Sequence, residues 1–151
     1  MGMMILGDAA YIPHEEFVKK IKEACCLLRD KAGARYTTLY NNVTLIKAYS
    51  KSGADVSKNN IDIGRATFDA SVTWLASVLV HEGIHIKQYK AGEDYSGQAA
   101  EQACNLVQLE VLQAIGAPQT EITHMLAQDG MHFDLNGDGV YDWKDYDLRN
   151  Y

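Results

Sequence analysis

The chain has 151 residues, which suffice for one domain with one hydrophobic core. Its 47% apolar and 23% charged residues are the proportions of an ordinary globular protein. The net charge of −6 argues against a nucleic-acid partner, and the longest uncharged apolar stretch, residues 70–80, is too short to span a membrane.

The first half of the chain predicts a helix followed by strands. Apolar side chains recur at helical spacing over residues 14–31, with lysine and glutamate between them. Residues 35–40 and 43–50 are rich in Tyr, Thr, Val and Ile and are joined by two asparagines, which indicates a β-hairpin. Residues 52–55 are typical of a turn, and alternating apolar positions over residues 60–68 predict a third strand.

The second half of the chain predicts helices. Residues 71–90 form a strongly apolar helix with a serine suited to cap its start. Further helices are expected at residues 97–115 and 118–128. This order predicts an α+β fold, with helices packed on one face of a small sheet of three or more strands. We expect one domain over residues 1–128, with an acidic tail over residues 129–151 packed on it.

The sequence His81-Glu82-Gly83-Ile84-His85 carries the strongest chemical signal. Two histidines four residues apart lie on the same face of a helix and can bind one Zn²⁺. Glu82 is rotated by roughly 100° from His81, so it can reach water beside the metal without binding the metal itself. This is the arrangement that a hydrolytic zinc site requires.

A catalytic zinc needs a third protein ligand. The downstream candidates are Glu93, Asp94, Glu101, Glu110 and His124. If the helices on either side of the intervening turn pack antiparallel, Glu101 lies level with the second histidine. Glu110 is then too far along its helix, whereas Glu93 and Asp94 lie in the turn itself. We favour Glu101, and His124 is the alternative if the later helix returns over the site.

The HExxH motif followed by Glu101 on the next helix resembles the gluzincin metallopeptidases, especially their minimal single-domain members. The resemblance extends from about residue 16 to residue 116 in the order of elements. It implies a zincin-like fold with an N-terminal helix, a short sheet, the motif helix and a glutamate helix. Cys104 departs from the family, where a small or acidic residue often follows the ligand glutamate by three. The metzincin pattern does not apply, because Ala91 stands where its third histidine would be.

The same resemblance implies a mechanism of peptide-bond hydrolysis. Water activated by zinc, assisted by Glu82, attacks the peptide carbonyl, and Glu82 then delivers a proton to the leaving amine. The strand before the motif helix would be the edge strand that pairs with an extended peptide. Its substrate-binding residues would be Asp62, Ile63, Gly64, Arg65 and Ala66. Candidates for the residue that stabilises the oxyanion are Tyr89, Tyr95 and His124.

The tail contains the pattern of an EF-hand calcium loop. The expected Ca²⁺ ligands are Asp134, Asn136, Asp138, the carbonyl of Val140, and Asp145, with Gly139 at the sharp turn. An aspartate rather than a glutamate at the last position resembles dockerin modules, although these carry two copies of the loop. Because the carboxylates repel one another without a cation, we expect a structural Ca²⁺.

The sequence is also compatible with two functions other than that of a zinc endopeptidase. One is a non-catalytic zincin-like or calcium-dependent interaction module, and the other is a toxin or effector cassette of a larger protein. The expected partners are a peptide or protein substrate, and an inhibitor, propeptide or immunity protein that silences the site. Three cysteines do not form a disulfide framework, and the first ten residues do not resemble a signal peptide. The compartment therefore stays open.

Overall fold

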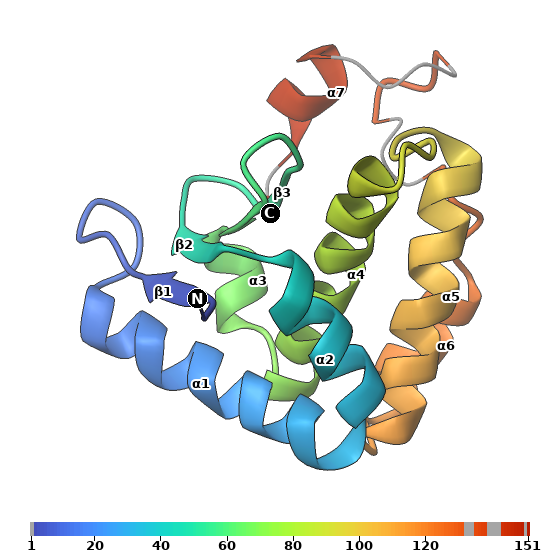
Figure 1. Cartoon of the computed structure of the whole chain (residues 1–151). Coiled ribbons are helices and arrows are strands. Elements are labelled where there is room, and N and C mark those ends of the chain that lie inside the picture. The colour runs from blue at the N-terminus through green and yellow to red at the C-terminus, as the bar shows by residue number, and fades with distance from the viewer. Residues whose placement is uncertain (1, 132–134, 139–142, 150) are drawn as a thin grey trace.

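A computed structural model describes residues 2–131, 135–138, 143–149 and 151. Within this part of the chain the fold is α+β, with seven helices and one four-stranded sheet (Figure 1). The elements in chain order are β1 (Met4–Leu6), α1 (His14–Lys31), α2 (Gly33–Asn42), β2 (Leu45–Ala48), β3 (Gly53–Asp55), β4 (Asn60–Ile63), α3 (Arg65–Asp69), α4 (Val72–Lys90), α5 (Gln98–Ala114), α6 (Gln119–Leu126) and α7 (Trp143–Leu148).

Helix α1 confirms the helix predicted for residues 14–31. Pro13 occupies its N-cap position, where the missing N–H of proline does little harm. Phe17, Ile21 and Leu28 recur on one face of α1 and are fully buried. The apolar period of the sequence therefore corresponds to the face that packs on the core.

The strand predicted for residues 35–40 is wrong, because these residues lie in helix α2. Two threonines, which normally favour strands, donate their hydroxyl protons to backbone carbonyls four residues earlier, Thr37 to Gly33 and Thr38 to Ala34. Leu39 is buried against α4. Tertiary packing of one apolar side of this segment overrides its β propensity.

The sheet has the strand order β1-β2-β4-β3. Strands β1, β2 and β4 are parallel, and β3 is antiparallel to β4. Strand β2 confirms the strand expected within residues 43–50, whereas the turn predicted at residues 52–55 is wrong because β3 lies there. Strands of three residues, such as β1 and β3, are too short to show an alternating pattern in the sequence.

Strand β4 is an interior strand, so the prediction that it is the edge that pairs with substrate is wrong. It ends at Ile63, and the residues expected to continue it, Arg65 and Ala66, begin helix α3. Gly64 at this junction allows the backbone of Lys51 to approach closely, because a Cβ on it would lie only 3.1 Å from the Cα of Lys51. The antiparallel edge strand of the sheet is β3.

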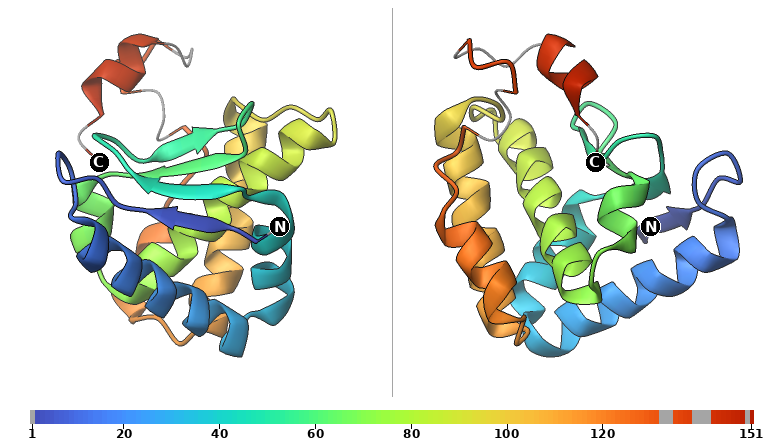
Figure 2. Two further views of the ribbon diagram at one scale, coloured as in Figure 1. Left: turned by 60° about the vertical axis from the view of Figure 1, so that its left-hand side comes forward. Right: turned by 180° about the vertical axis from the view of Figure 1, so that it is seen from behind.

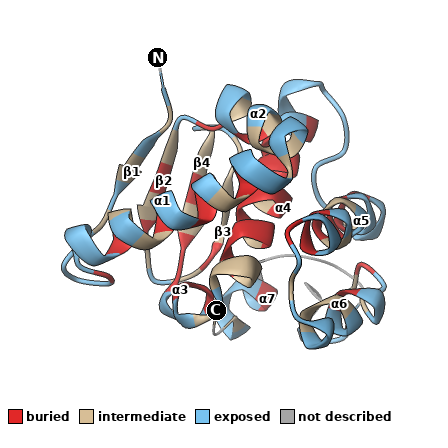
Figure 3. Cartoon of the chain, turned by 90° about the horizontal axis from the view of Figure 1, so that it is seen from below, coloured by how far each residue is buried: buried red, intermediate tan, exposed pale blue. Residues whose placement is uncertain are grey.

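One face of the sheet packs against helices. Ile46, Ile61 and Ile63 are fully buried there, and α1 and α4 belong to the same hydrophobic core (Figures 2 and 3). On the other face of β2 and β4, Lys47 and Asp62 form a partly exposed ion pair at 3.6 Å. The sheet is thus covered on one side, as predicted from the order of elements.

Helices α4 and α5 lie side by side and antiparallel (Figure 1). The Ser71 side chain accepts a hydrogen bond from the backbone N–H of Trp74, so it caps α4 as predicted. The turn between the helices contains Gly92 and Gly97 with φ of 72° and 89°, which glycine adopts most readily. Among the described residues, no helix combines the length and apolar character that crossing a membrane requires.

The described part of the tail packs on the rest of the molecule. The carbonyl of Tyr151 accepts a hydrogen bond from the backbone N–H of Ser52 at 2.8 Å, and Arg149 donates to the Ser52 carbonyl at 2.8 Å. Gln98 and Gln102 of α5 both donate to the carbonyl of Asp129. The end of the chain is therefore held beside β3 (Figures 1 and 2).

Candidate metal centre

Two buried stripes of polar side chains face each other between α4 and α5. Both follow helical spacing of three or four residues, which places each stripe on one face of its helix. On α4 the stripe consists of Ser77, His81, His85 and Gln88, and on α5 of Glu101, Cys104, Asn105 and Gln108. Polar groups buried in this number must pair with one another or hold a ligand.

Four ligand atoms converge at the centre of these stripes. The two Nε2 atoms of His81 and His85 are 3.2 Å apart. The carboxylate oxygens of Glu101 lie 3.2 Å from Nε2 of His81 and 3.1 Å from Nε2 of His85. Ligands that bind one zinc ion tetrahedrally at about 2.0 Å are separated from each other by roughly 3.3 Å. The separations in this protein therefore suit a single small metal ion.

Cys104 also belongs to a buried cluster that could hold a metal ion, since ligand atoms of His81, His85 and Cys104 all lie within 4.8 Å of one another. The thiol, however, lies 3.6 Å from Nδ1 of His85, which is the ring nitrogen turned away from Glu101. A metal ion held by the two Nε2 atoms would have the Glu101 carboxylate within reach, whereas the Cys104 thiol is near the other ring nitrogen of His85. Glu101 therefore lies on the side of the two Nε2 atoms, whereas Cys104 contacts the opposite nitrogen of His85.

Each histidine is oriented by a hydrogen bond at its other ring nitrogen. Nδ1 of His81 lies 2.8 Å from Oε1 of Gln108, whose amide in turn donates to the hydroxyl of Ser77 at 3.0 Å. Nδ1 of His85 faces the thiol of Cys104. With Nδ1 engaged in this way, both Nε2 atoms are directed toward Glu101, which is the orientation that joint metal binding requires.

Without a metal ion the site is an ion pair. Burial disfavours the charged form of His85, but hydrogen bonds to Cys104 and Glu101 and the negative charges of Glu82 and Glu101 outweigh it, raising the His85 pKa to about 11. Burial likewise opposes ionisation of Glu101, but hydrogen bonds from both histidines hold its pKa well below the usual value. The His85 imidazolium and the Glu101 carboxylate thus form a buried ion pair at the place where the candidate ligands converge.

Glu82 lies beside the converging atoms and outside the set that would bind the metal. It is half-buried, and its side chain lines two cavities that meet at the site. Among the described residues, none forms a hydrogen bond or ion pair with its carboxylate. A carboxylate in this position is available to accept a proton from water.

The first cavity, of about 590 Å³, lies on the β3 side of the site. All three residues of β3, Gly53–Asp55, line it, and so does Asp62 of the neighbouring strand. The second cavity, of about 510 Å³, lies on the α5 and α6 side. Ser52, His81, Glu82 and Tyr151 line both cavities. The two cavities are thus halves of one cleft that passes over the candidate metal centre.

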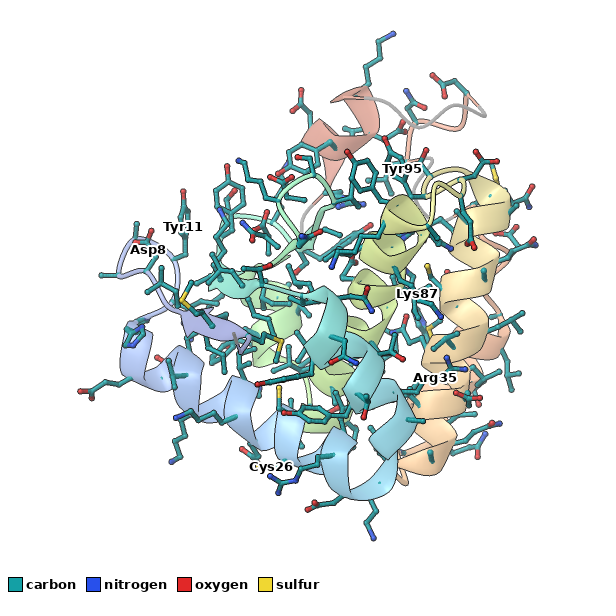
Figure 4. All side chains as sticks on the ribbon, in the orientation of Figure 1. Asp8, Tyr11, Cys26, Arg35, Lys87 and Tyr95 are labelled. Atoms are coloured by element: carbon teal, nitrogen blue, oxygen red, sulfur yellow. The ribbon has the colours of Figure 1, made fainter. Side chains whose placement is uncertain are left out.

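The predicted helper residues lie in different parts of this cleft. Tyr89 and Tyr95 line the first cavity and pack edge to face, with ring centroids 5.2 Å apart, and Tyr95 lies beyond the end of α4 (Figure 4). His124 lines the second cavity and packs edge to face against Trp74 at 5.4 Å. Tyr151 was not predicted, because no motif or spacing connects the last residue of the sequence to the histidines.

The residues expected to bind substrate separate in the structure. Asp62 lines the first cavity and Ala66 the second, whereas Ile63 is buried in the core. Arg65 is exposed and pairs with Glu16 and Asp69, so it lies outside the cleft. An interior strand has both edges paired, which leaves no edge of β4 for a substrate peptide.

Part of the predicted calcium loop can be placed. Asp145 is fully buried, and its carboxylate accepts hydrogen bonds from the backbone N–H groups of Leu135 and Asn136 at 2.9 and 3.3 Å. The Asn136 amide donates to Asp138 at 3.2 Å. The predicted ligands Asp134 and Val140, and Gly139, lie outside the described residues. Asp145 is therefore folded back onto the start of the loop.

No protein-family model matches this chain, and neither a curated protein nor a solved structure is significantly similar to it. A functional assignment therefore depends on the residues and the geometry of the site.

Proposed function

We propose that this protein is a zinc-dependent hydrolase and, more narrowly, a metallopeptidase that cleaves peptide bonds. The observation that carries the proposal is the convergence of two imidazole nitrogens and a carboxylate at separations of 3.1–3.2 Å, with Glu82 beside them in an open cleft. Two histidines and one glutamate are a ligand set that hydrolytic zinc sites use.

His81, His85 and Glu101 would hold the zinc ion through the two Nε2 atoms and the carboxylate. The bound zinc supplies a Lewis acid that lowers the pKa of water and polarises a carbonyl group. Gln108 and Cys104 keep the imidazole rings in the orientation that this binding requires. The remaining chemistry belongs to side chains that line the cleft.

Glu82 is the proposed general base and acid. Its carboxylate accepts a proton from the attacking water as the new C–O bond forms at the peptide carbonyl. It then returns this proton to the amide nitrogen, whose bond to carbon breaks and which leaves as a neutral amine. The absence of a hydrogen-bond partner for Glu82 among the described residues supports this role.

Tyr151 is the proposed donor to the developing oxyanion. Burial raises its pKa, Arg149 lowers it, and the negative charges of Glu82 and Glu101 raise it further, with the net pKa above its ordinary value. A phenol with a raised pKa keeps its proton at neutral pH and can donate it in a hydrogen bond. Its position at the junction of the two cavities favours it over Tyr89, Tyr95 and His124.

Strand β3 is the proposed docking edge for an extended peptide. It pairs with β4 along one side, and all of its residues line the first cavity. Because Ser52 already donates its N–H to Tyr151, a peptide would pair from Gly53 onward. Backbone pairing along this edge would carry the scissile amide toward Glu82.

Metal content tests the site first. Mass spectrometry of the purified wild-type chain is expected to find about one zinc per molecule. Glu101→Ala removes a ligand and loses the metal, whereas Cys104→Ser keeps it, because the thiol lies behind His85. Loss of zinc from Cys104→Ser with retention in Glu101→Ala would reverse the ligand assignment.

Cleavage of a peptide library tests the reaction. Glu82→Gln is expected to lower kcat by about 10²-fold or more while zinc content is unchanged. Tyr151→Phe, which removes one hydroxyl, should lower kcat by about 10²-fold with little change in KM. Tyr95→Phe is the matched control and should change neither. Stoichiometric zinc without cleavage of any peptide would support an interaction module instead.

A further inference from the structure

The second cavity has apolar walls and a polar end. Trp74 and Val78 of α4 and Met125 of α6 form its apolar surface. Asn105 of α5 lines it as well, one helical turn beyond Glu101. Because His81 and Glu82 also line this cavity, a group bound in it lies next to the reacting centre.

Asn105 is the unsatisfied member of the polar stripe on α5. The residue is only 7% exposed, and its amide nitrogen Nδ2 has no hydrogen-bond partner among the described residues. Its neighbours in the stripe are paired, since Gln108 binds His81 and Ser77, and Cys104 contacts His85. An unpaired buried amide is costly, and its position in a cavity wall indicates an acceptor supplied by a ligand.

The charges around the cavity restrict this ligand. None of the described residues that line it is Lys or Arg, and Glu82 contributes a negative charge. A carboxylate would be repelled by Glu82, and a cationic side chain would leave the Asn105 donor unpaired while neutralising Glu82. A neutral group that accepts a hydrogen bond pairs with the Asn105 donor and places no charge beside Glu82.

We propose that the second cavity binds the substrate side chain next to the scissile amide, and that Asn105 selects a large uncharged side chain with a hydrogen-bond acceptor near its end, as in tyrosine or glutamine. This inference rests on the proposed peptidase function. A volume of about 510 Å³ accommodates an aromatic ring, and Trp74 provides an apolar surface for it. Asn105 is thus a specificity residue, because it touches the substrate at a distance from the bond that breaks.

Binding of peptidyl hydroxamates to the zinc-loaded protein, measured by calorimetry, tests the inference without requiring turnover. Two compounds that differ only in Tyr against Phe isolate one hydroxyl group. The wild type is expected to bind the Tyr compound about 3- to 10-fold more tightly, the range of one neutral hydrogen bond. A Glu compound should bind more weakly than its Gln counterpart.

Asn105→Leu keeps the size of the side chain and removes the donor, so the preference for Tyr should disappear. Gln128→Leu is the matched control, because Gln128 lines the same cavity but already donates to the His124 carbonyl. This variant should prefer the Tyr compound over the Phe compound as strongly as the wild type does. The melting temperature of Asn105→Leu is expected to rise by about 2–4 °C, since a buried unpaired donor is removed.

The outcomes separate the inference from the function on which it rests. Equal affinity of the wild type for the Tyr and Phe compounds overturns the role of Asn105, and this comparison needs no variant. Retention of the Tyr preference in Asn105→Leu does the same. Failure of every hydroxamate to bind a protein with stoichiometric zinc overturns the proposed function, and the inference with it.

Discussion

Among single residues, His85 carries a proton when the site holds no metal ion, and this proton allows it to pair with Glu101. The raised pKa of His85, about 11 against an ordinary value of 6.5, means that its imidazole is protonated at neutral pH in the absence of metal. Glu101, with its pKa held below the ordinary value, carries the matching negative charge. If His85 is a zinc ligand as proposed, the metal ion has to displace this proton.

The affinity for zinc should therefore depend on pH. Because His85 binds zinc only when neutral and its folded pKa lies above the experimental range, lowering the pH from 8 to 6 should weaken binding by about tenfold per unit. Calorimetry at pH 7 in buffers of different ionisation enthalpy should detect release of about one proton per zinc ion. Affinity that is constant over this range would contradict the protonated state assigned to His85.

At the scale of helices and strands, the close packing of α2 on α4 positions the motif helix. A Cβ atom added to Gly83 would lie 3.0 Å from Cδ1 of Leu39, which is shorter than an ordinary van der Waals contact. The glycine in the middle of the motif thus allows α2 to approach α4. Arg35 of α2, labelled in Figure 4, also forms an ion pair with Glu110 of α5 at 2.6 Å. Helix α2 therefore contacts both helices of the site.

Overpacking this contact should destabilise the fold. Gly83→Val places a branched side chain against Leu39 and is expected to lower the free energy of unfolding by about 1–3 kcal/mol in urea denaturation. Gly33→Ala is the control, because a Cβ at Gly33 meets nothing within 4 Å, and its effect should be neutral or slightly stabilising. If Gly83→Val and the wild type have equal free energies of unfolding, helix α2 can move away from α4 without destabilising the fold.

At the scale of the whole molecule, the tail connects the predicted calcium loop to the cleft. Asp145 is buried against Leu135 and Asn136, and Lys51 donates to the carbonyl of Tyr146 at 2.5 Å. Beyond α7, Tyr151 reaches Ser52 and both cavities. We propose that calcium bound at this loop is structural and holds the end of the chain over the cleft.

Calcium should then stabilise the folded protein. At a free Ca²⁺ concentration of about 100 times its Kd, the free energy of unfolding is expected to rise by about 2.7 kcal/mol, measurable as an increase in melting temperature. Asp145→Asn should abolish the increase. Asp147→Asn, which changes an exposed carboxylate on the same helix, should preserve it. A melting temperature that does not change with Ca²⁺ would contradict the structural calcium ion. The carboxylate of Asp145 would then serve to accept hydrogen bonds from Leu135 and Asn136.

Features that depend on local spacing could be predicted from the amino-acid pattern. The four-residue interval of His81 and His85 places both on one face of α4, and Ser71 caps that helix through its own side chain. The position of Glu101 opposite His85 followed from two helices joined by a short turn, and the structure brings these groups to 3.1 Å. These features involve residues close in the chain, whose relative positions helix geometry dictates.

The distant segments that meet at the site could not be predicted from the amino-acid pattern. Strand β4 proved to be interior, with β1 and β3 at the edges of the sheet. Tyr151 lies at the junction of the two cavities, and Asn105, whose Nδ2 has no hydrogen-bond partner among the described residues, lines the second cavity. Each depends on how strands order in a sheet or how α5, α6 and the tail pack around α4. Such contacts join residues that are far apart in the sequence. They arise from the packing of whole helices and strands, which local residue patterns do not predict.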